Sequence, residues 1–214
     1  MNRHTELHKR VLDLPEDIIE RVQDRLKEFE QKGHKGDRVW FSELCFCILT
    51  ANSKAETALR IEKELGTRGF CQSCFDDVKN CIISHKHRFH NNKASYIVGA
   101  RKHLHLKRTL VPIINSEGER AGRRWLVDHI KGIGYKEASH FLRNVGYKNV
   151  AILDRHILRM LAEHGFMQEV PQALTPKRYL QVEAIFSGIA QDLSMSLAEL
   201  DLRIWYLKTG KILK

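Results

Sequence analysis

The sequence predicts an all-α protein, and three features of its pattern support that fold class. Apolar residues recur every three or four positions along most of the 214 residues, which is the spacing of one face of a helix. Alternation of apolar and polar residues, the pattern of a half-buried strand, is nowhere sustained. The chain has only four prolines, and glycines stand where several apolar stripes end. We therefore expect helices joined by short turns.

Capping residues and glycines divide the first part of the chain into predicted helices. Asp13 is the N-cap candidate of the first one, and a proline follows in its first turn. The apolar run 39–51 indicates a buried helix, because it is too short to cross a bilayer. Asn52 and Ser53 are expected to cap the next helix, which Gly66 ends. The predicted helices here cover residues 13–33, 39–51, 53–66, 75–84, 93–103 and 119–130.

The remainder of the chain follows the same rules. Thr175 and Pro176 form an N-cap and first-turn pair, and the residues after them place apolar side chains on one stripe. The last helix starts at Ser196 and carries Leu200 and Ile204 on its packing face. The predicted helices of this part cover residues 135–145, 154–164, 175–189 and 196–207.

The chain carries an excess of positive charge, with a formal net charge of +10 and a pI of about 9.5. Such an excess favours an anionic partner, usually nucleic acid, although a basic soluble enzyme would also have it. Hydrophobic residues make up 43% and charged residues 29%, which is typical of a globular chain. The polar start MNRHTELHKR does not resemble a signal peptide. We expect a soluble, cytoplasmic protein that works at the nucleoid.

The cysteines raise the question of a metal site. An odd number of cysteines without a secretion signal favours reduced thiols. Cys71, Cys74 and Cys81, with His85 and His87 close behind, could supply zinc ligands, but a second paired knuckle is missing. We therefore favour structural or incidental thiols and expect no metal. The full set is Cys45, Cys47, Cys71, Cys74 and Cys81, of which the first two belong to the predicted buried helix.

A glycine turn joins the helices predicted at 119–130 and 135–145. Gly132 and Gly134 permit a tight hairpin, and the apolar Ile133 between them can anchor it. Backbone amides at the start of the second helix suit a phosphate, and Lys131 and Lys136 flank them. A glycine turn alone is often a plain cap. In this basic context it resembles the helix-hairpin-helix element, which binds DNA phosphates without reading bases.

Lys136 and Asp154 form the candidate catalytic pair. Lys136 lies at the start of a helix, where it could simply contact a phosphate. An amine that is partly desolvated near other cations can instead act as a nucleophile. Asp154 follows the apolar run 150–153 and could simply cap the next helix. A carboxylate can also stabilise a positively charged sugar while a glycosidic bond breaks.

The run HIKGIGYKEASHFLRNVGYKNVAILDRHILRML (129–161) resembles the helix-hairpin-helix/Gly-Pro-Asp superfamily of base-excision glycosylases. Within it, the chain is similar to the archaeal-type (type 2) 8-oxoguanine DNA glycosylase/AP lyases. The similarity extends from WFSELCFCILTAN (40–52) through HRF (87–89) to DLRIWYLKTGKILK (201–214). Where the superfamily commonly has Gly-Pro-Asp or Pro-Val-Asp, this chain has Ile-Leu-Asp. No cysteine lies beyond Cys81, so the iron–sulfur loop of endonuclease III relatives is absent.

The resemblance implies two helical lobes with an active-site cleft between them. One lobe covers about 38–148, and the other combines 1–37 with 149–214. Lys136 would attack as a Schiff-base nucleophile and Asp154 would assist, with neither an iron–sulfur cluster nor a catalytic metal. A monovalent cation could sit at the hairpin carbonyls. The implied partner is double-stranded DNA containing 8-oxoguanine, bound by a monomer. A glycosylase for another damaged base and a non-catalytic DNA-binding module remain the alternatives.

Two further segments are candidate DNA contacts. His87, Arg88 and Phe89 form the first of them, and a cation beside an exposed aromatic ring suits insertion into the gap left by a flipped nucleotide. The alternative is a cluster at a helix end with Phe89 in the core. Near the C-terminus, Trp205 could stack on the flipped base, and the resemblance assigns the terminal Lys214 to the lesion pocket. The alternative is a core Trp205 and a solvated chain end. Gly210 and Ile212-Leu213 predict a tail that turns back and packs.

Overall fold

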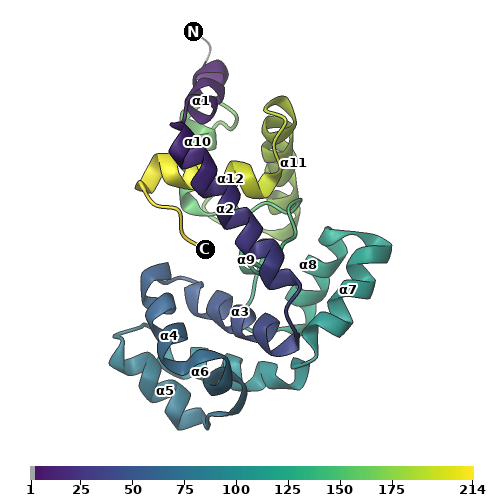
Figure 1. The fold of residues 1–214 in the computed structure, drawn as a ribbon. Helices are drawn as coiled ribbons and strands as arrows, with labels where there is room; N and C mark the ends of the chain where they lie inside the picture. Colours follow the sequence, from purple (N-terminus) through teal and green to yellow (C-terminus); the bar gives the residue numbers. More distant parts are fainter. Residues whose placement is uncertain (1–2) are drawn as a thin grey trace. The chain divides into compact units, whose positions relative to one another are not determined.

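The computed structural model describes residues 3–214, and all regular structure in that range is helical. Within it, no helix is long and apolar enough to cross a membrane. The start of the MNRHTELHKR stretch, Met1 and Asn2, lies outside the described residues. The elements are α1 (Arg3–Leu12), α2 (Glu16–Gly33), α3 (Asp37–Thr50), α4 (Ala55–Gln72), α5 (Phe75–Ser84), α6 (His90–Ala100), η1 (Arg101–His103), α7 (Leu106–Glu117), α8 (Glu119–His129), α9 (Tyr135–Asn144), α10 (Arg155–Glu163), α11 (Pro176–Asp192) and α12 (Leu197–Thr209) (Figure 1).

The chain divides into two units. The middle unit comprises Gln31–Val145, and the terminal unit combines the chain up to Glu30 with Gly146–Lys214. The family resemblance implied a first boundary at about 37/38, several residues later. The earlier boundary follows from contacts of the last turn of α2. Lys32 pairs with Glu43 of α3, and the Trp40 indole donates a hydrogen bond to the Gly33 carbonyl at 3.1 Å.

The middle unit is built around α3. Every residue from Trp40 to Thr50 is buried, because α4, α6, α7 and α9 all pack against this helix. The buried stretch includes Cys45 and Cys47, as the sequence predicted. A helix that is covered on all sides has no polar face, which explains its nearly continuous apolar sequence.

The terminal unit has its core between the two ends of the chain. One face of α2 packs against α12 and the C-terminal tail, and this contact removes a continuous apolar cluster from water. No element was predicted before Asp13, but α1 forms there and buries Leu7 and Val11. The buried members of the α2 cluster are Leu14, Ile18, Val22, Leu26, Phe29, Ala198, Leu202 and Ile212.

Three expectations for the middle unit were wrong. No helix was predicted at 106–117, but α7 forms there despite an internal proline and buries Leu106, Leu110 and Ile114 along one face. Asn52 and Ser53 do not cap α4, whose N-cap position is Lys54. Gly66 interrupts α4 with φ +58° instead of ending it, because the helix resumes after this kink.

Candidate active site and DNA-binding residues

The hairpin between α8 and α9 forms as predicted, and its glycines have specific tasks (Figure 1). Gly132 adopts φ +90°, a conformation that side chains rarely tolerate. A Cβ atom there would also lie 2.2 Å from the ring of Tyr96, so α6 packs directly against the turn. Ile133 is buried and anchors the hairpin. Backbone conformation and close packing therefore both require glycine at position 132.

Glu137 is a site residue that sequence reasoning missed. One carboxylate oxygen accepts a hydrogen bond from the Gly134 amide at 3.3 Å, and the other lies 3.1 Å from Nζ of Lys136. The Gly134 amide is therefore occupied, whereas the sequence analysis expected free amides at this helix start. A glutamate at the third position of a helix is a recognised capping signal and could have revealed the first contact. Lys136 itself keeps 29% of its side chain exposed.

The segment 87–89 separates a buried histidine from an exposed phenylalanine. His87 is buried, and its ring nitrogens lie 2.9 Å and 2.6 Å from the carbonyl oxygens of Leu49 and Arg88. Arg88 donates to the Asn52 carbonyl at 2.7 Å, and its guanidinium lies 5.4 Å from the Phe89 ring centroid. Phe89 is 52% exposed in a left-handed conformation with φ +60°. A core position for Phe89 is thus wrong. His87 was expected to contact DNA, but it is buried and instead holds the segment in place.

Lys93 is a second lysine beside the candidate nucleophile that the sequence analysis did not single out. Its buried Nζ donates to the carbonyl oxygens of Ile48 at 2.5 Å and Ala51 at 2.9 Å, at the end of α3. Burial lowers the pKa of Lys93 to about 8; the carboxylate of Glu137 acts in the opposite direction, and the charge of Lys136 adds to the decrease. The C-terminus of α3 is therefore held by a buried cation next to the hairpin charges.

Asp154 belongs to the terminal unit and caps α10. Its Oδ1 accepts hydrogen bonds from the amides of His156 at 2.8 Å and Ile157 at 2.9 Å. The preceding residues 150–153 are buried, as predicted. The capping role, which sequence reasoning kept as an alternative, is therefore confirmed. A capping carboxylate is fixed in place, and this does not prevent its second oxygen from acting on a substrate.

Two residues of α11 hold the backbone that leads to Asp154. The Tyr179 hydroxyl donates to the Ala151 carbonyl at 2.7 Å and accepts from the Leu153 amide at 3.3 Å. The buried Glu183 carboxylate accepts from the Ala151 amide at 2.9 Å. Sequence reasoning placed Tyr179 on an apolar stripe and overlooked Glu183. An acidic residue beside a predicted buried stripe was the only signal available.

The C-terminal residues of the terminal unit are held in place. Gly210 ends α12 with φ +68°, and Ile212 joins the cluster on α2, so the prediction of a packed tail is confirmed. Trp205 is partly exposed, and its ring meets that of His156 edge to face at 5.1 Å between centroids. This contact links Trp205 to the first turn of the helix that Asp154 caps. Lys214 is partly exposed at the end of the tail.

Cys71, Cys74 and Cys81, which could have bound zinc together, have different surroundings in the structure. Cys74 caps α5 by accepting a hydrogen bond from the Asp77 amide at 3.4 Å. Cys81 instead lies beside Glu64 and His85. Burial, followed by the adjoining Glu64 carboxylate, raises the pKa of the Cys81 thiol to about 12. Among the described residues, no group of three metal-ligand side chains includes Cys71 or Cys74.

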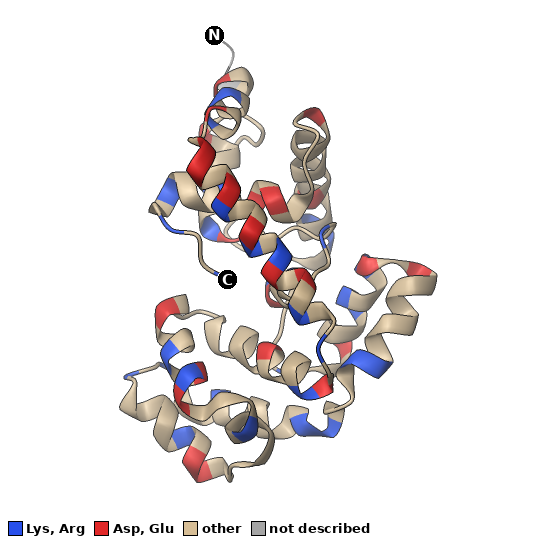
Figure 2. Cartoon of the chain, viewed as in Figure 1, with Lys and Arg blue, Asp and Glu red and all other residues tan. Residues whose placement is uncertain are grey.

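Positive charge is distributed over both units. Lys and Arg residues occur on many helices, and acidic residues are interspersed with them along α2 (Figure 2). The net charge of +10 therefore does not come from a single helix or tail. A nucleic-acid interface has to be argued from particular residues, chiefly those of the hairpin and the segment 87–89.

A glycine hairpin between two helices, with lysines on both sides of the turn, defines a helix-hairpin-helix protein. A profile of the family described as 8-oxoguanine DNA glycosylase matches residues 22–195. The chain belongs to this family.

Individual relatives agree with this assignment over almost the full length. The 8-oxoguanine DNA glycosylase/AP lyase of Methanocaldococcus jannaschii is 47% identical over 210 residues, which cover 97% of this chain and 99% of the relative. The enzyme of the same name from Thermotoga maritima is 40% identical, covering 97% and 98%. A crystal structure of the M. jannaschii protein in complex with a 15mer DNA containing 8-oxoguanine superposes with a TM-score of 0.93 at 45% identity, covering 98% of this chain and 100% of that one.

Proposed function

We propose that this protein excises 8-oxoguanine from double-stranded DNA and then cuts the strand at the resulting abasic site. The single observation that supports it best is Lys136, a partly exposed amine in the first turn after the Gly132–Gly134 hairpin. A module that only binds DNA needs just the turn and basic residues, whereas the reaction also needs a carboxylate, a role that we assign to Asp154. The family assignment and the DNA complex of the M. jannaschii relative support the substrate.

The reaction starts with the damaged nucleotide flipped out of the duplex, because the reacting sugar carbon is inaccessible in the stack. The Lys136 amine attacks C1′, the bond between C1′ and the base breaks, and the base leaves with a proton. Asp154 stabilises the positive charge that develops on the sugar. Attack requires a neutral amine, so Lys136, which pairs with Glu137, must first give up a proton to a base or to water.

The covalent product then carries out the strand cut. Opening of the sugar ring gives an imine between Lys136 and C1′. The imine makes the C2′ proton acidic, and loss of that proton expels the 3′ phosphate oxygen by β-elimination. Water finally hydrolyses the imine and restores the amine. These steps use no redox cofactor, iron–sulfur cluster or catalytic metal, and a monovalent cation at the hairpin carbonyls would serve only to bind a phosphate.

The remaining candidate residues bind the DNA and the lesion. Lys131 and the hairpin contact phosphates, which fixes the position of the strand without reading its sequence. Arg88 and Phe89 fill the gap left by the flipped nucleotide. The Phe89 ring is exposed, and the buried His87 holds this segment in place. Trp205 stacks on the flipped base, and Lys214 presents its ammonium group to the polar edge of that base. One monomer is sufficient for all of these contacts.

Borohydride trapping tests the proposal. Reduction of the imine should give a stable covalent complex between the protein and an oligonucleotide containing 8-oxoguanine. Lys136→Gln should abolish trapping, while Lys131→Gln, a matched loss of one positive charge on the same hairpin, should still trap. Trapping by Lys136→Gln would overturn the assignment of the nucleophile. Trapping with an oxidised pyrimidine or an alkylated purine in preference to 8-oxoguanine would overturn the substrate.

A further inference from the structure

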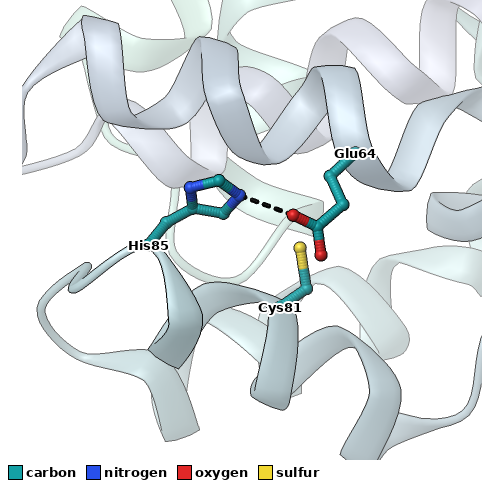
Figure 3. Close-up of side chains that lie close together, drawn as sticks. All are labelled: Glu64, Cys81 and His85. Atoms are coloured by element: carbon teal, nitrogen blue, oxygen red, sulfur yellow. Dashed lines mark hydrogen bonds and ion pairs between the residues drawn. The ribbon is translucent and has the colours of Figure 1, made fainter.

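Three side chains of the middle unit form a cluster that the proposed reaction does not use. Glu64 projects from α4, while Cys81 and His85 come from α5 and its C-terminal cap (Figure 3). One donor atom from each of the three lies within 4.8 Å of the other two. The His85 Nε2 atom is 2.8 Å from a Glu64 carboxylate oxygen.

The donor set is chemically suited to a zinc ion. Thiolate, imidazole and carboxylate are the three side-chain ligands that Zn²⁺ takes, whereas Mg²⁺ and Ca²⁺ require oxygen ligands. Zinc-to-ligand bonds of about 2.0–2.3 Å place tetrahedral ligand atoms roughly 3.3–3.8 Å apart. The three donor atoms lie within 4.8 Å of one another and the His85–Glu64 pair is at 2.8 Å, so binding requires side-chain torsions to change while the helices stay in place.

The backbone supports the same geometry. Cys81 and His85 are four residues apart, which places their side chains on one face at the end of α5. The thiol is buried, whereas the side chains of His85 and Glu64 are 20% and 54% exposed. A metal ion can therefore enter from the solvent side, and water can occupy a fourth position.

We propose that Glu64, Cys81 and His85 bind one Zn²⁺ ion, with water as the fourth ligand. Binding replaces the hydrogen bond between His85 and Glu64 with two bonds to the metal, and the Cys81 proton is released to solvent. The ion would join α4 to the end of α5, two residues before His87 in the segment that presents Phe89. Its task is structural, and the inference does not depend on the proposed excision reaction.

Cobalt(II) binding tests the site directly, because a bound thiolate gives a near-ultraviolet charge-transfer band. Untagged protein freed of metal by a chelator should develop this band with an end point of one equivalent, and added Zn²⁺ should remove it. Cys81→Ser should lose the band, while Cys74→Ser, which removes the exposed cysteine at the other end of α5, should keep it. Absence of the band in the unchanged protein, or its persistence in Cys81→Ser, would overturn the proposal.

Variants at the exposed ligands guard against misfolding of Cys81→Ser. Mutation of a residue that only hydrogen-bonds to a metal ligand typically lowers metal affinity by about 10–100-fold. Loss of a direct ligand in Glu64→Gln or His85→Asn should therefore weaken Co²⁺ binding by at least about tenfold. Zinc should raise the melting temperature of the unchanged protein by a few degrees, as expected for a tight ligand of the folded state. The melting temperature of each variant should stay nearly the same when zinc is added. Equal affinities in the unchanged protein and both variants would exclude these two residues as ligands.

Discussion

Asp154 illustrates how one side chain can serve both the fold and the proposed chemistry. Its Oδ1 accepts two amide hydrogen bonds at the start of α10, and the Tyr179 and Glu183 side chains hold the preceding backbone. The carboxylate is therefore held in one position before any substrate arrives. This fixed orientation is what electrostatic stabilisation of a developing charge requires.

Asp154→Asn separates these two tasks. Asparagine caps helices about as well as aspartate, so we expect DNA affinity and melting temperature to change little. Loss of the negative charge should decrease the single-turnover rate of excision by about a hundredfold or more. Asp154→Ser, which also caps, serves as a control and should be equally slow. Excision by Asp154→Asn at the unchanged rate would reduce Asp154 to a structural cap.

At the scale of elements, the hairpin depends on α6. Gly132 has both a positive φ and contact with Tyr96, while Lys93, on the same helix, holds the C-terminus of α3. Helix α6 thus connects the glycine turn with the C-terminal end of α3. Because α6 packs against the turn, the first turn of α9 and Lys136 have a defined position within the middle unit.

Gly132→Ala should therefore damage the hairpin in two ways. The positive φ costs about 1–2 kcal/mol for a residue with a side chain, and the overlap with Tyr96 adds to it. Gly134→Ala is the matched control, because Gly134 has φ −104° and the nearest atom to an added Cβ is 3.4 Å away. We expect Gly132→Ala to lower the free energy of unfolding, measured with denaturant, and the DNA affinity clearly more than Gly134→Ala does. Equal effects of the two substitutions would contradict this account of the turn.

At the scale of the whole molecule, the two ends of the chain build one unit. Residues of α2 pack against α12 and against Ile212 in the tail, so the C-terminus is part of a core and does not fray. Lys214 lies two residues after the packed Ile212, which limits where Lys214 can lie. Long-range packing thereby turns a chain end into a candidate recognition element.

Deletion of Lys214 tests this role of the C-terminus. Deletion of Lys214 leaves the packed Ile212 in place, so the melting temperature should stay nearly the same. Excision of 8-oxoguanine should fall by about tenfold or more, since polar groups that match the base are lost. Cleavage at a preformed abasic site should survive, because it needs Lys136 and no base contact. Excision at the unchanged rate would show that Lys214 does not recognise the lesion.

The sequence by itself was sufficient to predict the elements that depend on local signals. Caps at Thr175 and Ser196 marked the starts of α11 and α12, and the glycine pair marked the hairpin. These signals work because a cap or a positive φ concerns only neighbouring residues. The same local reasoning failed for α7, where an internal proline concealed a buried helical face. It also failed for α1, whose two buried residues form too short a stripe to recognise.

Only the tertiary structure decided which side chains support the candidate site. Lys93 meets carbonyl groups more than forty residues earlier in the chain, and Glu183 meets an amide thirty-two residues before it. The tertiary structure also buries His87 while it leaves Phe89 exposed, and it places Glu64 next to Cys81 and His85. Such pairs depend on how helices pack, and side-chain packing couples residues at any separation along the chain. Local sequence patterns carry no record of those separations, which is why the candidate nucleophile was predictable and its surroundings were not.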